Sequence, residues 1–66
     1  MQKIDIDILI PVFNEGDKIL KLMELFQKNV KGKFRVIFCY DDNTDDIFFH
    51  KNKLQNFNFD VQFIKN

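Results

Sequence analysis

The stretch ILIPVFNEG, residues 8–16, marks the point where an apolar strand gives way to a helix. Upstream of it, isoleucines alternate with aspartates and a leucine, and this period of two predicts a β-strand over residues 4–12. The second half of that strand is apolar on both faces, as is typical of a parallel strand covered by helices. Pro11 has no backbone donor and is expected to end the ladder of hydrogen bonds.

A helix is predicted directly downstream, over residues 17–30. Apolar side chains recur there at steps of three and four residues, and they form the single stripe of an amphipathic helix. Asn14 is a suitable N-cap, and Glu15 and Asp17 suit the positive end of the helix dipole. Gly32 follows as the expected C-terminal stop.

Two more strands and a second helix complete the predicted order. Residues 34–40, FRVIFCY, read as a second apolar strand, and residues 41–46 as a loop. A short helix is predicted over residues 47–55, and residues 57–64 alternate apolar with polar side chains as a half-exposed third strand. The order βαβαβ predicts an α/β fold with a three-stranded parallel sheet in the order 3-2-1. This is one nucleotide-binding half of a Rossmann-like fold.

The length, composition and charge of the chain restrict the class of protein to which it can belong. The chain has 66 residues, enough for one domain, and it is 45% hydrophobic with nine phenylalanines, which favours a packed core over disorder. Ten basic residues balance ten acidic ones, whereas a nucleic-acid binder usually carries a basic excess. No apolar run reaches the ~20 residues of a membrane span. With one cysteine and no unbroken apolar signal segment, we expect a cytoplasmic location.

The residues with chemistry lie in two loops. Parallel strands end at the same edge of a sheet, so the loop PVFNEG, residues 11–16, and the loop DDNTDD, residues 41–46, are expected to be neighbours. There Phe13 can stack on a base, Glu15 can accept from ribose hydroxyls, and Asp41 can accept from an N–H of a base. Neither GxGxxG nor GxxxxGK[ST] occurs, which disfavours ordinary dinucleotide and P-loop binding.

Simpler interpretations of the same residues stay open. Phe13 can be a core aromatic, and DDNTDD can be a solvated turn that caps the second helix. A calcium loop fails, because its sixth position is Asp46 instead of glycine and its twelfth is Asn52 instead of glutamate. His50, the only histidine, has no serine or cysteine placed to complete a triad, so no catalytic residue is assigned in this chain.

Two segments carry a resemblance to a known family. DILIPVFNEG resembles the opening strand and PxYNE-type motif of family 2 glycosyltransferases, which have the GT-A fold. RVIFCYDDNTDD resembles the second strand of that family and its acidic loop, often of the form DDxSxD. The likeness spans residues 4–48. It implies that residues 1–66 are a single partial domain, the N-terminal, nucleotide-binding portion of a catalytic domain.

The resemblance implies a nucleoside-diphosphate sugar as the ligand. The residues that carry over by position to its pocket are Pro11, Val12, Phe13, Glu15, Asp41, Asp42 and Asp45. Phe13 stands where the family often has tyrosine, Glu15 matches the acid that faces the ribose, and Asp41 matches the acid that reads the base. Asp42 and Asp45 carry over in a loop that is one residue shorter than the usual one.

The resemblance also implies parts that this sequence does not match. The family's metal-binding DxD motif, its catalytic base and its acceptor site follow later strands, and none of the 66 residues corresponds to them. A divalent metal, Mg²⁺ or Mn²⁺, is therefore expected for the full-length parent, with no ligand for it in this chain. The chain alone is expected to be inactive as a transferase.

Two other hypotheses stay open. A small non-enzymatic interaction module, receiver-like or flavodoxin-like, would place a strand-end acid pair where Asp41 and Asp42 stand, although such folds need about five strands. The second hypothesis concerns assembly. The first strand lies at an edge of a 3-2-1 sheet, and an open apolar edge favours pairing with another chain. Self-association through that edge is therefore expected.

Overall fold

The computed structural model describes residues 6–66, so residues 4 and 5 of the first predicted strand lie outside the described part. The elements are β1 (Ile6–Pro11), α1 (Gly16–Asn29), β2 (Phe34–Tyr40), the 3₁₀ helix η1 (Asp46–His50), α2 (Lys51–Leu54) and β3 (Asp60–Lys65). The strands form one parallel sheet in the order β1-β2-β3, which is the predicted 3-2-1 order counted from the other edge. The α/β fold with a three-stranded parallel sheet is confirmed.

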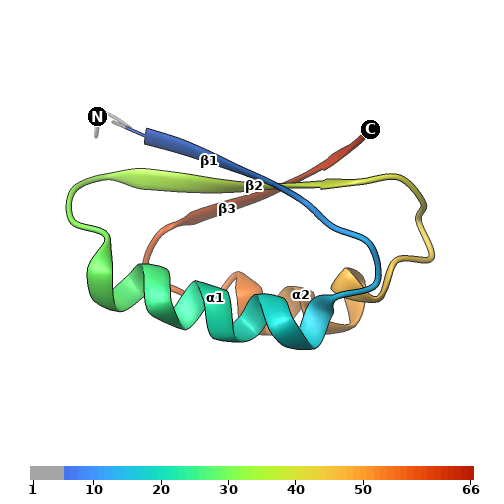
Figure 1. Ribbon diagram of the computed structural model, residues 1–66, viewed down its shortest axis with the longest axis horizontal. Coiled ribbons are helices and arrows are strands. Elements are labelled where there is room, and N and C mark those ends of the chain that lie inside the picture. Colours follow the sequence, from blue (N-terminus) through green and yellow to red (C-terminus); the bar gives the residue numbers. More distant parts are fainter. Residues whose placement is uncertain (1–5) are drawn as a thin grey trace.

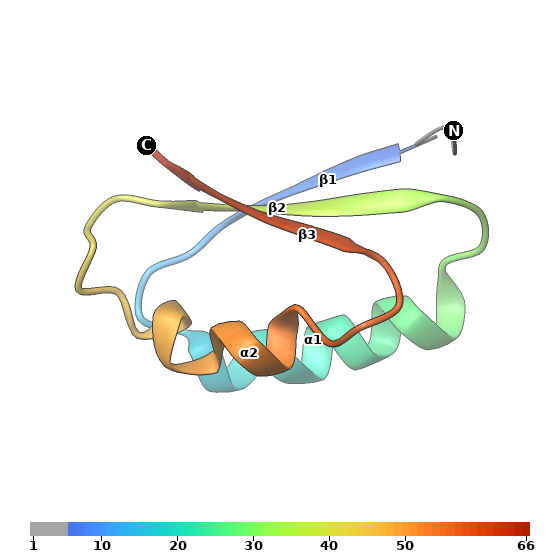
Figure 2. The same cartoon turned by 180° about the vertical axis from the view of Figure 1, so that it is seen from behind.

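Both helices lie on one face of the sheet (Figures 1 and 2). The chain moves across the sheet in one direction, from β1 to β2 to β3, and crossovers of the same hand then place both helices on the same side. The expectation that helices cover both faces of the first strand is therefore wrong. On the open face, Leu9 of β1 is 63% exposed and Ile64 of β3 is 48% exposed.

The open face also carries an ion pair. Asp7 of β1 lies opposite Arg35 of β2 in the parallel register. The guanidinium Nη2 is 2.8 Å from Asp7 Oδ2, and Nε donates to Oδ1 at 3.0 Å, so the pairing is bidentate. This contact accounts for an aspartate within an otherwise apolar strand.

The core lies between the sheet and the helices. Alternate residues of β2 point into it, and α1, η1 and α2 cover them. The buried cluster comprises Val12, Ile19, Met23, Phe34, Val36, Phe38, Ile47 and Leu54. Phenylalanines extend it into the third strand, because the rings of Phe38 and Phe63 are 5.5 Å apart between centroids. The period of two in the last strand therefore corresponds to an inner and an outer face.

Two elements differ from prediction by more than a shift of one residue. The second predicted helix is divided into η1 and α2. The third strand begins at Asp60, which pairs with Arg35, and not at residue 57. Phe57 and Phe59 precede the ladder and stack on each other at 5.4 Å, while the N–H of Asn58 donates to a side chain of α1, Gln27 Oε1, at 3.4 Å. The alternating pattern thus begins before the ladder does.

One glycine and one proline lie close to where the sequence predicts that an element ends. Pro11 is the last residue of β1. Gly32 has a φ of 94°, a left-handed conformation that favours glycine, shortly after α1 ends at Asn29.

Within residues 6–66, no helix is both long enough and apolar enough to cross a membrane.

Candidate functional site

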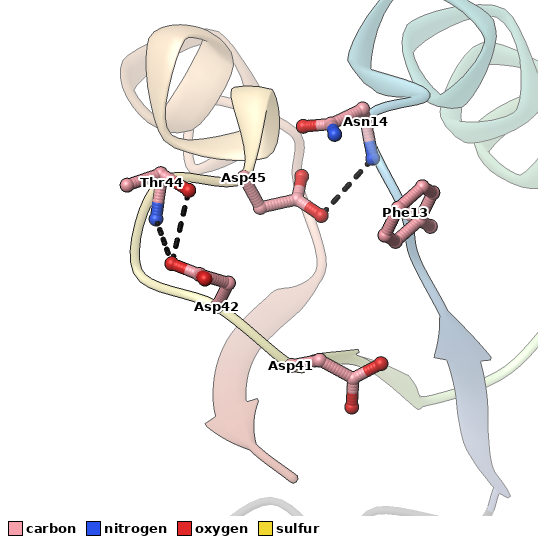
Figure 3. A pocket seen from close by; sticks show the side chains of 6 residues that line it. All are labelled: Phe13, Asn14, Asp41, Asp42, Thr44 and Asp45. Carbon is pink, nitrogen blue, oxygen red and sulfur yellow. Dashed lines mark hydrogen bonds between the residues drawn. The ribbon is translucent and has the colours of Figure 1, made fainter.

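The loops after β1 and β2 meet at the carboxyl edge of the sheet and are joined by hydrogen bonds. The N–H of Asn14 donates to Asp45 Oδ2 at 3.0 Å (Figure 3). In return, the N–H of Asp46 donates to Asn14 Oδ1 at 3.1 Å, and the N–H of Gly16 donates to Asp46 Oδ1 at 3.0 Å. We call these four residues the loop clamp. The clamp places the two segments singled out in the sequence side by side.

The backbone of Asn14 explains why asparagine suits the clamp. Its φ is 49°, in the left-handed region, where asparagine is tolerated better than most residues other than glycine. In this conformation its N–H and its side-chain oxygen both bond to the second loop. The prediction that Asn14 caps α1 is therefore wrong. The N-cap is Glu15, and its side chain makes no capping hydrogen bond.

Asp45 is the buried acid of the clamp, with 6% of its surface exposed. Oδ2 accepts from Asn14, and Oδ1 accepts from the N–H of Ile47 at 2.9 Å, so the same carboxylate caps η1. Both oxygens thus already accept backbone N–H groups, which is the role that makes aspartate a favoured N-cap. Asp45 therefore acts mainly by holding the two loops together, and its oxygens are less available to a ligand.

Gly16 ends the PVFNEG segment because another side chain lies where its Cβ would be. An added Cβ would come within 2.3 Å of His50 Cδ2 and 3.3 Å of the Asp46 carbonyl oxygen. The His50 ring, 20% exposed, also places Nε2 3.3 Å from Asp17 Oδ1. The glycine lets η1 lie close to the start of α1, and this closeness keeps the hydrogen bonds of the loop clamp short.

A hollow of about 230 Å³ lies between the two loops (Figure 3). The residues that line it are Phe13, Asn14, Asp41, Asp42, Thr44 and Asp45. The hollow is smaller than the ~300–1,000 Å³ typical of ligand pockets, so it suits one ring of a ligand and not a whole nucleotide. Phe13 is 71% exposed, which leaves its ring available for stacking and makes the core-aromatic interpretation wrong.

The hollow is acidic and rich in hydrogen-bond acceptors. Thr44 donates to Asp42 Oδ1 from its N–H and from its hydroxyl, each at 2.9 Å. The bond from the backbone N–H, followed by the bond from the hydroxyl, lowers the pKa of Asp42. Asp41 Oδ1 accepts from the side-chain amide of Asn66 at 3.0 Å. An aromatic face beside carboxylates suits a planar ring with N–H donors and disfavours a phosphate.

Four of the seven residues carried over from the family line the hollow, and three lie outside it. Val12 is 4% exposed in the core, and its N–H donates to the Cys39 carbonyl oxygen at 2.9 Å. Pro11 is exposed at the end of β1, opposite Cys39. Glu15 is exposed at the start of α1 and does not line the hollow.

Three polar residues at the site were not singled out from the sequence for binding. Asn14 and Thr44 line the hollow, and Asn66 contacts the Asp41 carboxylate. A signal for Asn66 was present, because it follows the third parallel strand, and all three strands end at the same edge.

The described residues do not fit the divalent metal that the resemblance implies. Across residues 6–66, no group of three or more histidine, cysteine, aspartate or glutamate side chains is placed to hold a metal ion. Within the second loop, Asp45 already accepts the N–H groups of Asn14 and Ile47, and Asp46 accepts the N–H of Gly16.

Comparisons with models of protein families, with curated proteins and with solved structures find no significant match to this chain. The likeness to family 2 glycosyltransferases therefore depends on the two sequence segments themselves. What that likeness implies for function is a proposal.

Proposed function

We propose that this chain is the donor-binding, N-terminal part of a family 2 glycosyltransferase domain with the GT-A fold. In this proposal the hollow between the two loops holds the nucleoside of a nucleoside-diphosphate sugar. The observation that carries the proposal is that Phe13 and Asp41, from two separate segments with a family resemblance, line the same hollow.

The chemistry of the hollow supports a base as the bound group. The exposed Phe13 ring offers a stacking surface, and stacking tolerates any base because each has a π-face. Asp41 supplies an acceptor for a base N–H at the rim of the same hollow. The carboxylates would repel a diphosphate, so the phosphates and the sugar extend away from the acids. A small hollow with few contacts predicts weak binding by this chain alone.

In the parent reaction, an acceptor hydroxyl oxygen forms a bond to the anomeric carbon of the donor sugar. The bond from that carbon to the diphosphate oxygen breaks, and the nucleoside diphosphate leaves with the electron pair, while the hydroxyl proton passes to a base. None of the 66 residues corresponds to the family's base, acceptor site or metal ligands. The role proposed for this chain is therefore to hold the nucleoside, and purified chain is expected to transfer no sugar.

The test is a titration of the ¹⁵N-labelled chain with uridine diphosphate and guanosine diphosphate, followed by amide chemical shifts. Shifts are expected at residues 11–16 and 40–46. Phe13→Ala should weaken binding by about 5- to 150-fold, the loss expected for one stacking contact. Phe49→Ala is the matched control, because Phe49 is 87% exposed on η1 and does not line the hollow. Equal effects of the two variants, or shifts confined to other residues, would overturn the proposal.

We also propose that two copies of the chain associate through the outer edge of β1. Among the strands of residues 6–66, β1 lies at an edge and pairs with β2 alone, so one side of its backbone has no neighbouring strand there. Ile6 and Leu9 on this strand are 50% and 63% exposed. The same row of donors and acceptors on a second copy is complementary to it. Pro11 limits the pairing to residues before it.

A further inference from the structure

We infer that Asn66, the residue directly after β3, is a positioning residue for Asp41 at the candidate nucleoside hollow. The inference rests on the proposed function. It adds the third strand to a site that the sequence motifs place on the first two loops only.

Two donors of Asn66 hold the carboxyl end of β2. Its N–H donates to the Tyr40 carbonyl oxygen at 2.7 Å, one residue beyond the last pair of the β2–β3 ladder. Its side-chain Nδ2 donates to Asp41 Oδ1 at 3.0 Å. The backbone bond fixes where Asn66 lies, and the side-chain bond then fixes the carboxylate of Asp41. An exposed aspartate without such a partner would exchange among its staggered rotamers.

The bond constrains the Asp41 carboxylate without occupying it. Within residues 6–66, Asn66 supplies the one protein hydrogen bond to this carboxylate, and that bond goes to Oδ1. Oδ2 therefore stays available to a donor on the ligand. By contrast, both oxygens of Asp45 already accept backbone N–H groups. Asp41 thus combines a fixed orientation with an open acceptor, as does Asp42, whose two bonds from Thr44 both go to Oδ1.

The type of residue at position 66 also matters. A neutral amide orients Asp41 and leaves its negative charge in place. A lysine or arginine there would form an ion pair with the carboxylate and compete with the N–H groups of a ligand. Asparagine therefore suits a residue that prepares an acceptor for a neutral donor such as a base N–H.

The first arm of the test measures binding. Uridine diphosphate is titrated into the wild-type chain and into Asn66→Ala, which keeps the backbone N–H to Tyr40. We expect Asn66→Ala to bind about three- to tenfold more weakly, the net effect of one hydrogen bond. Asn52→Ala, the same change at an exposed residue of α2, is the matched control and should bind like wild type.

The second arm asks whether Asn66 acts through Asp41. In an Asp41→Ala background, Asn66→Ala should cause no further loss of affinity, because the group that it positions is already gone. A full three- to tenfold loss in that background would overturn the positioning role and show that Asn66 contacts the ligand itself.

The third arm needs no ligand. The Hα–Hβ three-bond couplings of Asp41 should report one rotamer in the wild-type chain and averaged rotamers in Asn66→Ala. Identical couplings in the two proteins would overturn the positioning role. A wild-type chain that shows no shift at any loop residue with either uridine diphosphate or guanosine diphosphate would instead overturn the proposed function. The two failures are therefore distinguishable.

Discussion

Replacing Asp45 with alanine should destabilise the fold more than any other single change to an acid of the second loop. The substitution removes the acceptors of two backbone N–H groups, those of Asn14 and Ile47. Loss of an N-cap costs about 0.5–2 kcal/mol, and a buried N–H left without a partner costs about 1–3 kcal/mol. Asp45 is 6% exposed, so water cannot fully replace either bond. The expected loss is about 2–4 kcal/mol.

That loss is large for a chain of this size. At about 0.05–0.15 kcal/mol per residue, 66 residues have a free energy of unfolding of about 3–10 kcal/mol. The assay is urea denaturation followed by far-UV circular dichroism, with the slope on denaturant compared between proteins. Asp45→Asn, which keeps one acceptor oxygen, should lie between wild type and Asp45→Ala.

The matched control is Asp41→Ala, the same change in the same loop at an exposed carboxylate. It should alter the free energy of unfolding by about 0.5 kcal/mol or less, as is usual for surface sites. The reasoning is refuted if Asp45→Ala is as stable as Asp41→Ala. That result would mean that the clamp adds nothing to the stability of the fold.

Three further predictions concern packing, pH and assembly. Gly16→Ala should cost about 1–3 kcal/mol of stability through overpacking against His50, and the cost should shrink in a His50→Ala background, as measured by thermal unfolding. NMR titration should place the pKa of Asp42 below its ordinary 3.8. Thr44→Ala keeps the backbone N–H and removes the hydroxyl bond, so it should raise that pKa only part of the way. Because the pKa of Asp42 is lower in the folded state, the stabilisation from its bonds to Thr44 is complete above the unfolded-state pKa. It is lost as the pH falls through the folded-state pKa. An unchanged pKa of Asp42 in Thr44→Ala would contradict the role of the Thr44 hydroxyl. Light scattering should show mass rising with concentration, and Leu9→Lys on the edge strand should suppress it; a clean monomer at high concentration argues against the β1 edge.

The fold could be predicted because its signals are local. A period of two in the first and third strands and a stripe in α1 are enough to give the order of elements, and that order restricts the sheet to parallel pairing. The open face could not be predicted in this way. ILIPV has the same apolar pattern whether a helix covers its second face or, as in Leu9 and Pro11, that face lies open.

The adjacency of the two loops also followed from parallel topology, whereas the roles of individual residues did not. The acids Asp41, Asp42, Asp45 and Asp46 are chemically alike in the sequence. Only the register of β1 against β2 determines which carboxylate meets the N–H of Asn14. The left-handed φ of Asn14 could not be predicted from the sequence either, because an asparagine at this point suits an N-cap equally well. The role of Gly16 depends on His50, which is distant in sequence.

The loop clamp has a consequence for the order of events during folding. Its bonds join residues separated by 30 to 32 positions, so none of them can form until β1 and β2 have come together. Contacts that form after the rate-limiting step slow unfolding without speeding folding. Asp45→Ala loses one of these long-range bonds as well as the local cap of η1, so it should unfold faster than wild type in stopped-flow experiments, with a smaller change in its refolding rate. The acidic loop therefore contributes to the lifetime of the folded state.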